Sequence, residues 1–446
     1  MTNLKKALFL WEQTVWWKLI RQSLASNCGA IDKTDIYAKI IVYFNFSNAK
    51  IMKYINRELE IHLKKYLPLP EILAIVGPRR SGKTTFLNHL TSTLSDCICV
   101  SFENQVILDL FDLEIETFAA RYLLPAKYLI IDEFQHAKKG GKNLKFLYDT
   151  YPGKKIIISG SSSPDLTIKA LRFLTGRCLV FTLLPFNFSE FILTKPPQPT
   201  EKELKNYFRE YVSFGGYPEV VLQKDTEIKK TLLQNVYSLF FSREVRDLTF
   251  LSDDYKLKNL LKALSLAAGN LIEYRELTQT SGFDYLTLKR YLNFLDKTFI
   301  AFPLFPYFRN RRTELVKNPK IYFYDLGLRN SLIDNFLPFD LRPDKGILVE
   351  NFVATTLHSF YQDLHFWRTK NKAEVDFVFE AGGRLFSCEA KAGKEENIPT
   401  SLISFMEKYS VQKAFVVNEE KGQNKKVGQT AIDFIPYWQP NILRIS

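Results

Sequence analysis

The stretch GPRRSGKT, from Gly77 to Thr84, constrains the fold of this chain more than any other stretch. It follows the apolar run EILAIV (71–76) and opens the apolar-periodic stretch TTFLNHL. A strand, a glycine-containing loop and a helix in this order form a phosphate-binding loop, in which backbone N–H groups and the helix dipole surround a phosphate. The pattern therefore predicts nucleotide contacts from Gly77, Pro78, Arg79, Arg80, Ser81, Gly82, Lys83, Thr84 and Thr85.

An acidic pair at the end of the apolar run YLIID predicts the second half of this site. We expect Lys83 to pair the β- and γ-phosphates of ATP, and Thr84 and Asp132 to hold Mg²⁺. Asp132 thereby also belongs to the nucleotide contacts. Glu133 would orient or deprotonate the attacking water. A plain surface acid pair after a strand is the alternative.

Two further residues are candidates for acting on the γ-phosphate. The run KKIIISGSSS ends in hydroxyl groups, of which Ser161 is the candidate sensor; a serine-rich turn without a role is the alternative. Arg177, in LTGR, is a candidate transition-state arginine acting on a neighbouring subunit, and an ordinary surface arginine is the other interpretation.

Charge and cysteine content bound the partners and the compartment. The 446 residues suffice for about three domains, and the net charge of +13 favours a polyanionic partner, nucleic acid before membrane. A general basic bias with solvated lysines is the alternative. The five cysteines form neither a zinc pattern nor a disulfide framework, which predicts a reducing cytoplasm. No apolar run reaches the roughly 18 residues of a membrane span.

Residues 253–330 have the spacing of helix, helix, turn and helix, followed by a basic loop. The predicted core positions of the third helix are Leu286, Tyr291 or Leu292, and Leu295. Its other side carries Thr287, Lys289 and Arg290, and the loop would be a basic wing with Arg309, Arg311, Arg312, Lys317 and Lys320. Such a winged helix predicts contact with DNA phosphates, and a protein-interaction module is the alternative.

The stretch AEVDFVFEAGGRLFSCEAKAG predicts two antiparallel strands around a Gly-Gly turn at 382–383. Counting from that turn sets Asp376 opposite Glu389, and Glu374 opposite Lys391. The alternate positions form an apolar core face. Two carboxylates that face each other destabilise a sheet unless a positive charge lies between them, so the pattern predicts a bound cation.

Several motifs together resemble one family. GPRRSGKT, IIDEFQ, ISGSSS, LTGR, LPFNFSEF and FGGYPEV occur in the order found in prokaryotic AAA-type ATPases that carry a C-terminal domain long described as of unknown function. The resemblance extends over roughly residues 52–446 and includes INRELE near its start. It implies ATP hydrolysis at a P-loop with Mg²⁺, and a homo-oligomer, ring-like or other.

The last domain of that family resembles PD-(D/E)xK nucleases, which implies a second metal site. On this resemblance Asp376, Glu389 and Glu350 would hold Mg²⁺ or Mn²⁺, and Lys391 would be the catalytic lysine that orients the water. Ala390 stands where the family usually has a β-branched residue. A retained nuclease fold that binds DNA or a partner without cutting is the alternative.

Together the patterns predict an α/β fold in five segments. These are an N-terminal extension of uncertain origin (1–51), an AAA-type P-loop ATPase core with a parallel sheet (52–195), a helical lid (196–252), a winged-helix segment (253–330) and a restriction-endonuclease-like α/β domain (331–446). The predicted function is a Mg²⁺-dependent ATPase that controls a DNA-binding, and by resemblance DNA-cleaving, module. The rivals are an ATP-driven signalling or defence switch whose C-terminal domain is a non-catalytic binding module, and a mobile-element ATPase that contacts DNA without cleaving it.

Overall fold

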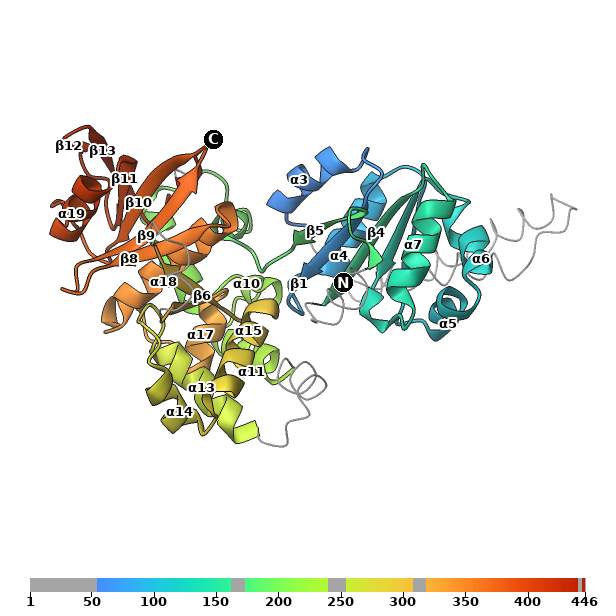
Figure 1. Ribbon diagram of the computed structural model, residues 1–446, viewed down its shortest axis with the longest axis horizontal. Helices are drawn as coiled ribbons and strands as arrows, with labels where there is room; N and C mark the ends of the chain where they lie inside the picture. Colours follow the sequence, from blue (N-terminus) through green and yellow to red (C-terminus); the bar gives the residue numbers. More distant parts are fainter. Residues whose placement is uncertain (1–53, 162–172, 240–253, 308–317, 440–442, 446) are drawn as a thin grey trace, which may run out of the picture. The chain divides into compact units, whose positions relative to one another are not determined.

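The computed structural model describes residues 54–161, 173–239, 254–307, 318–439 and 443–445 (Figure 1). The extension predicted for 1–51 lies outside them. The described residues form an α/β protein with two β-sheets, one parallel and one mixed, as predicted. No described helix is long and apolar enough to cross a membrane.

The first sheet has five parallel strands in the order β2-β3-β4-β1-β5. The strands are β1 (Ile72–Gly77), β2 (Cys97–Ser101), β3 (Tyr128–Asp132), β4 (Lys155–Ser161) and β5 (Cys178–Thr182). The central ones are short apolar runs without alternation, which is typical of strands covered on both faces. Because β4 lies between β1 and β3, the loop after β1 and the acids after β3 lie at the same edge of the sheet, one strand apart.

Helices lie against both faces of this sheet (Figure 1). On the face of Ile72, Ala74 and Val76 lie α5 (Gln105–Leu113), α6 (Ile115–Phe118), a π-helical turn (Ala119–Leu123) and α7 (Gly140–Thr150). The other helices of this part are α3 (Glu58–Tyr66), which contacts β5, and α4 (Lys83–Thr93), which contacts β1, β2 and β3. A short 3₁₀ turn, η2 (Phe134–His136), follows β3.

The segment after the first sheet is helical, as its pattern predicts. It contains α8 (Phe188–Ile192), α9 (Glu201–Phe214), α10 (Pro218–Val221) and α11 (Thr226–Leu239). Reciprocal capping boxes start two of these helices, Asn187 with Glu190 at α8 and Thr200 with Glu203 at α9.

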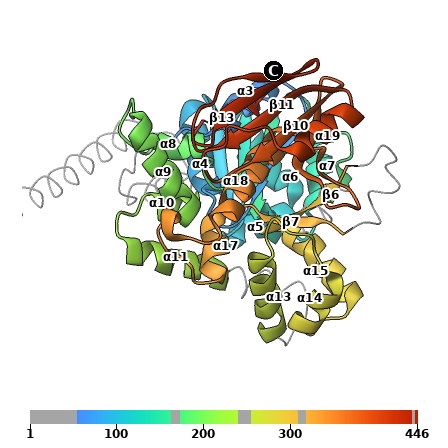
Figure 2. The same ribbon diagram turned by 90° about the vertical axis from the view of Figure 1, so that its left-hand side faces the viewer.

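Three helices and a strand pair follow, namely α13 (Asp254–Leu266), α14 (Tyr274–Ser281), α15 (Tyr285–Lys297), β6 (Ala301–Pro306) and β7 (Lys320–Phe323). The three helices lie side by side (Figure 2) and share one hydrophobic core with α10, α11, β6 and β7. One predicted core residue is wrong, because Leu286 is 64% exposed whereas Leu288 is fully buried. Two residues along a helix correspond to a rotation of about 200°, and Leu288 rather than Leu286 shares the face of Tyr291, Leu292 and Leu295.

The second sheet has eight strands in the order β12-β13-β11-β10-β9-β8-β6-β7. Its remaining strands are β8 (Leu364–Arg368), β9 (Glu374–Ala381), β10 (Arg384–Ala390), β11 (Val411–Asn418), β12 (Lys425–Val427) and β13 (Thr430–Pro436). Helix α18 (Lys345–Phe360) packs on one face and α19 (Thr400–Lys408) on the other. The parallel pairing of β6 with β8 joins the three-helix segment to this sheet across the boundary proposed at residue 330. The short helices between β7 and α18 are α17 (Leu326–Leu332) and η6 (Phe339–Leu341).

The hairpin β9–β10 has the predicted register. Arg384 pairs with Ala381, and Cys388 pairs with Phe377. Both turn glycines have positive φ, 55° and 73°, as a two-residue hairpin turn requires. The predicted pairing of Glu374 with Lys391 does not occur, because β10 ends at Ala390 and the Lys391 N–H donates to the Val417 carbonyl of β11.

Candidate functional site

The phosphate loop combines two glycine requirements with a buried lysine. Gly82 has a φ of 93°, and a Cβ on Gly77 would lie 2.2 Å from the Leu183 carbonyl oxygen. Lys83 begins α4 and is buried, and its Nζ donates to the carbonyl oxygens of Gly77 (2.9 Å) and Pro78 (2.8 Å). The ammonium group that the phosphates of ATP require therefore already lies inside the loop. The remaining predicted contacts lie in this loop and the first turn of α4, namely Arg79, Arg80, Ser81, Thr84 and Thr85.

The carboxylate of Asp132, at the end of β3, lies against the start of α4. Its Oδ2 accepts a hydrogen bond of 2.8 Å from the Thr84 hydroxyl. Its Oδ1 accepts from the Ser159 hydroxyl and from the Glu133 N–H (3.0 Å). A hydroxyl and a carboxylate side by side at a phosphate loop are oxygen donors of the kind that Mg²⁺ binds, so the residues present fit the metal. Ser159 was not predicted, although its run of apolar residues ending in hydroxyls was the available signal.

Glu133 and Ser161 lie at the same edge of the sheet. Glu133 has a φ of 54°, and its Oε2 accepts from the Gln135 side-chain amide. The backbone of Ser161 pairs with Gly77 across β4 and β1. The edge therefore brings a carboxylate and the predicted sensor position next to the phosphate loop.

Arg177 lies at the opposite end of the strands. It directly precedes β5, and its carbonyl accepts from the Ile72 N–H at the beginning of β1, whereas the phosphate loop follows the end of β1. Its guanidinium Nε is 2.9 Å from Asp149 Oδ1. Arg177 therefore does not join the other predicted catalytic residues within its own chain.

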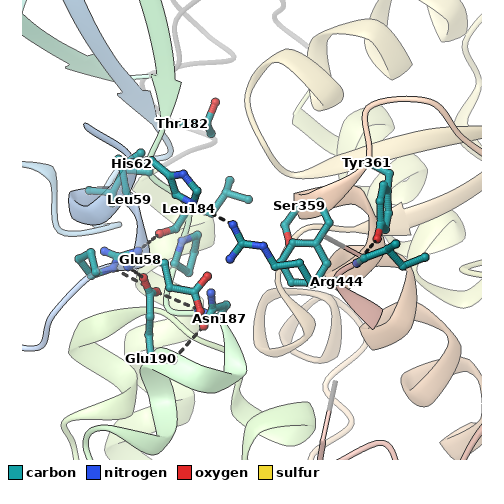
Figure 3. Close-up of a pocket in the computed structure, with 15 residues that line it drawn as sticks. Glu58, Leu59, His62, Thr182, Leu184, Asn187, Glu190, Ser359, Tyr361 and Arg444 are labelled. Atoms are coloured by element: carbon teal, nitrogen blue, oxygen red, sulfur yellow. Dashed lines mark hydrogen bonds and ion pairs between the residues drawn. The ribbon is translucent and has the colours of Figure 1, made fainter. Parts of the chain in front are cut away.

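A buried arginine that the sequence did not point out supports the phosphate loop from outside. Arg57 donates from Nη1 to the Ser81 carbonyl (3.0 Å) and from Nη2 to the Leu184 carbonyl (2.5 Å). Its Nε is 3.1 Å from Glu190 Oε2, and both side chains are 5% exposed. Figure 3 shows Glu190 in turn accepting from the backbone N–H of Glu58 and Asn187. The motifs INRELE and LPFNFSEF thus meet in one ion pair behind the loop.

The predicted hairpin carboxylates lie together in the second sheet and are buried. Asp376 Oδ2 accepts from the Ala390 N–H (2.9 Å), and Glu389 Oε2 accepts from the Asp376 N–H (3.3 Å). Lys391 Nζ donates to Glu389 Oε1 at 2.8 Å. Burial raises the pKa of Asp376 well above its usual range, and the carboxylates of Glu389 and Glu350 raise it further.

The fourth predicted residue, Glu350 on α18, pairs with a lysine. Lys320 Nζ is 3.0 Å from Glu350 Oε1 and 2.6 Å from Glu374 Oε1. The Tyr322 hydroxyl also donates to Glu350 Oε1 at 2.6 Å. The prediction that Lys320 belongs to a basic wing is therefore wrong, because its side chain is 3% exposed and points to carboxylates. The other wing positions, Arg309, Arg311, Arg312 and Lys317, lie outside the described residues.

These residues fit a divalent metal poorly. Each of the three predicted ligands gives at least one oxygen to an N–H, ammonium or hydroxyl donor of the protein. Over residues 54–445, apart from the undescribed gaps, no three His, Cys, Asp or Glu side chains are arranged to hold a metal ion. Burial alone would lower the pKa of Lys320, but Glu350, Asp376 and Glu374 together raise it, so the lysine stays charged.

Different family models match the N-terminal and C-terminal parts of the chain. The family model described as AAA domain matches residues 69–192, and models described as domains of unknown function (DUF8612 and DUF4143) match residues 205–338 and 345–439. An uncharacterized protein of Methanocaldococcus jannaschii is 29% identical over 369 residues, which are 78% of this chain and 80% of that protein. An uncharacterized protein of Mycobacterium tuberculosis is 26% identical over 355 residues, covering 78% and 76%.

Among solved structures, a Walker-type ATPase of Pyrococcus abyssi is 19% identical and covers 63% of this chain and 96% of that chain, with a TM-score of 0.39. The match to the AAA-domain model agrees with the geometry of the loop, the lysine and the strand-end carboxylate. Residues 69–192 of this chain are a P-loop ATPase domain of the AAA type.

Proposed function

We propose that this chain is a Mg²⁺-dependent ATPase whose nucleotide state controls DNA binding by its C-terminal half. The observation that carries the ATPase part is the hydrogen bond between the Thr84 hydroxyl and the Asp132 carboxylate beside the buried Lys83. Bound Mg²⁺ would neutralise charge on the β- and γ-phosphates. Thr84 and Asp132 would hold it, and Lys83 would turn from the loop carbonyls to the phosphates.

Glu133 is the proposed base for the attacking water. Its contact with the Gln135 amide would orient the carboxylate at the edge of the sheet where the phosphates bind. Ser161 is the proposed γ-phosphate sensor, supported by its backbone position beside Gly77. Arg177 lies at the opposite end of the sheet from the phosphate loop of its own chain, so its proposed action is on a neighbouring subunit of a homo-oligomer.

The proposed DNA contact rests on α15, the third helix of the proposed winged-helix segment. Asp284 caps this helix by accepting from the Thr287 N–H, and the side chains of Lys289 and Arg290 are exposed on it. The Lys289 ammonium group lies over the Tyr285 ring, 4.6 Å from its centroid. Exposed cations on a capped helix suit contact with backbone phosphates.

For the C-terminal domain we propose binding without cleavage, in preference to metal-dependent cleavage by Asp376, Glu389, Glu350 and Lys391. The pairing of Lys320 with Glu350 and Glu374 supports this choice, because one of the three predicted metal ligands, Glu350, is already paired with a protein cation. A signalling or defence switch with a protein partner is the second candidate, and it shares the same non-catalytic domain.

DNA binding at several salt concentrations tests the proposal. Fluorescence anisotropy with duplex DNA, with ATP or ADP present, is expected to show binding that weakens with salt and differs between nucleotides. The double change Lys289→Ala and Arg290→Ala should lower the salt slope by about two units, because each phosphate contact adds about one. Lys202→Ala, an exposed lysine of α9, serves as the control. Absence of salt-dependent binding in every nucleotide state would favour the signalling switch.

A further inference from the structure

A lysine lies at the centre of the carboxylate cluster in the C-terminal domain. Lys320 comes from β7, Glu350 from α18 and Glu374 from β9, so three elements far apart in the chain meet at one ammonium group. The Lys320 side chain is 3% exposed, and its ammonium group lies 5.6 Å from the Phe366 ring centroid. Arg368 adds a second cation, 2.7 Å from Glu374 Oε2.

The lysine is held from both its backbone and its surroundings. Its backbone pairs with Leu304 of β6 and forms a bridge with Leu271. Gly269, at a φ of 75°, approaches the same place, since a Cβ there would be 3.4 Å from both carboxylate oxygens of Glu350. Turning the lysine out would remove its ammonium group from two partly buried carboxylates, of which Glu374 would keep Arg368 and Glu350 would keep the Tyr322 hydroxyl, and this loss is unfavourable.

We propose that Lys320 is a permanent internal cation in the place of a divalent metal, so that the nuclease-like cluster binds neither Mg²⁺ nor Mn²⁺. A divalent ion shared by Glu350 and Asp376 would lie within a few ångströms of this ammonium group, and like charges at that distance repel each other in a poorly solvated site. The carboxylates of Asp376 and Glu389 meanwhile accept from backbone N–H groups, and Glu389 also accepts from a second ammonium group, that of Lys391.

The cation has a structural consequence. It ties β7, which belongs to the three-helix segment by sequence, to α18 and to the hairpin strand β9. The inference deepens the proposed binding role of the C-terminal domain and rests on it: Glu350, to which the resemblance assigns a metal, serves together with Glu374 to join two segments. The domain would recognise its ligand through surfaces that need no metal.

Mn²⁺ binding to the full-length, nucleotide-free chain tests this inference. All proteins carry Thr84→Ala, so that the phosphate loop contributes no hydroxyl ligand, and free Mn²⁺ is measured by its electron paramagnetic resonance signal. With Lys320 in place, adding Asp376→Asn is expected to leave the amount of bound Mn²⁺ unchanged. Lys320→Met, which keeps an unbranched side chain without charge, is expected to gain one equivalent of Mn²⁺ that Asp376→Asn removes again.

Each outcome either supports or overturns the inference. An equivalent of Mn²⁺ bound by the Lys320 protein and lost with Asp376→Asn would overturn the inference, and so would a folded Lys320→Met protein that gains no Mn²⁺. If Lys320→Met does not fold, the test uses only the two proteins that retain Lys320, with and without Asp376→Asn. Equal Mn²⁺ binding by these two proteins supports the inference, and unequal binding contradicts it. ATP hydrolysis and DNA binding are measured on the chain with Thr84 intact, so a failure of the proposed function is recognised separately.

Discussion

The Thr84 hydroxyl donates a hydrogen bond of 2.8 Å to the Asp132 carboxylate, although 48 positions of sequence separate the two residues. The strand order explains this contact. β4 lies between β1 and β3, and its Ser159 hydroxyl reaches the other oxygen of the same carboxylate. Both oxygens of Asp132 are thus oriented by donors before any nucleotide binds, which reduces the ordering that binding must still accomplish.

Lys83→Ala is expected to abolish ATP hydrolysis. The Lys83 ammonium group is the buried cation inside the phosphate loop, and the loss of such a charge at a transferring phosphate costs about 10²-fold or more in kcat. Steady-state phosphate release measures the effect, and circular dichroism checks that the variant is folded. Hydrolysis within about tenfold of the wild type would contradict the assignment of this loop as the ATP site.

Glu133→Gln should separate ATP binding from hydrolysis. The amide keeps the size of the side chain but cannot accept a proton, and general-base catalysis typically contributes 10²- to 10⁴-fold. We expect hydrolysis to fall by about that factor while the Kd for a fluorescent ATP analogue stays within roughly threefold. Asp132→Asn is the informative comparison, because loss of a predicted metal ligand should weaken both steps. If Glu133→Gln weakened ATP binding as much as it slowed hydrolysis, Glu133 would be assigned to nucleotide binding instead.

The sequence predicted the features that depend on residues close together in the chain. The phosphate loop and the hairpin register follow from glycine positions and a two-residue period, and the structure has both. The contacts that the sequence did not indicate join distant segments: Arg57 reaches Glu190, and Lys320 reaches Glu374. In the sequence, a lysine or arginine that is buried in an ion pair cannot be distinguished from a solvent-exposed one, because its partner becomes its neighbour only when the chain has folded.

Arg57→Ala is expected to destabilise the ATPase domain and to raise the KM for ATP. Its partner Glu190 would remain buried without its cation, and breaking one side of a buried ion pair costs about 3–5 kcal/mol. The carbonyls of Ser81 and Leu184 would lose their donors as well, so the loop should be less ordered. Chemical denaturation and ATPase kinetics measure the two effects.

The matched control is Lys394→Ala, which removes an exposed ion pair with Glu420. Such a pair is screened by solvent, and no change in the denaturation midpoint is expected. If Arg57→Ala behaved like Lys394→Ala, the contact behind the phosphate loop would have no measurable part in stability.

His358 should make stability depend on pH. Its ring stacks on Phe302 with centroids 4.2 Å apart, and burial lowers its pKa from the usual 6.5 to about 4. The folded state therefore binds fewer protons than the unfolded chain between these values, so the contribution is complete above about pH 6.5 and is lost as the pH falls towards about 4. A shift of this size corresponds to at most about 3 kcal/mol.

His358→Phe keeps the ring and removes the titrating group, so the difference in unfolding free energy between wild type and variant isolates the effect. We expect the wild type to lose about 2 kcal/mol relative to the variant between about pH 7 and about pH 4.5. Burial raises the pKa of Asp325 to about 6, which makes stability fall as the pH rises through the same range, opposite in sign. Both proteins retain Asp325, so its contribution cancels in the difference. A difference that stayed constant with pH would mean that the folded protein lets His358 take up a proton as easily as the unfolded chain does.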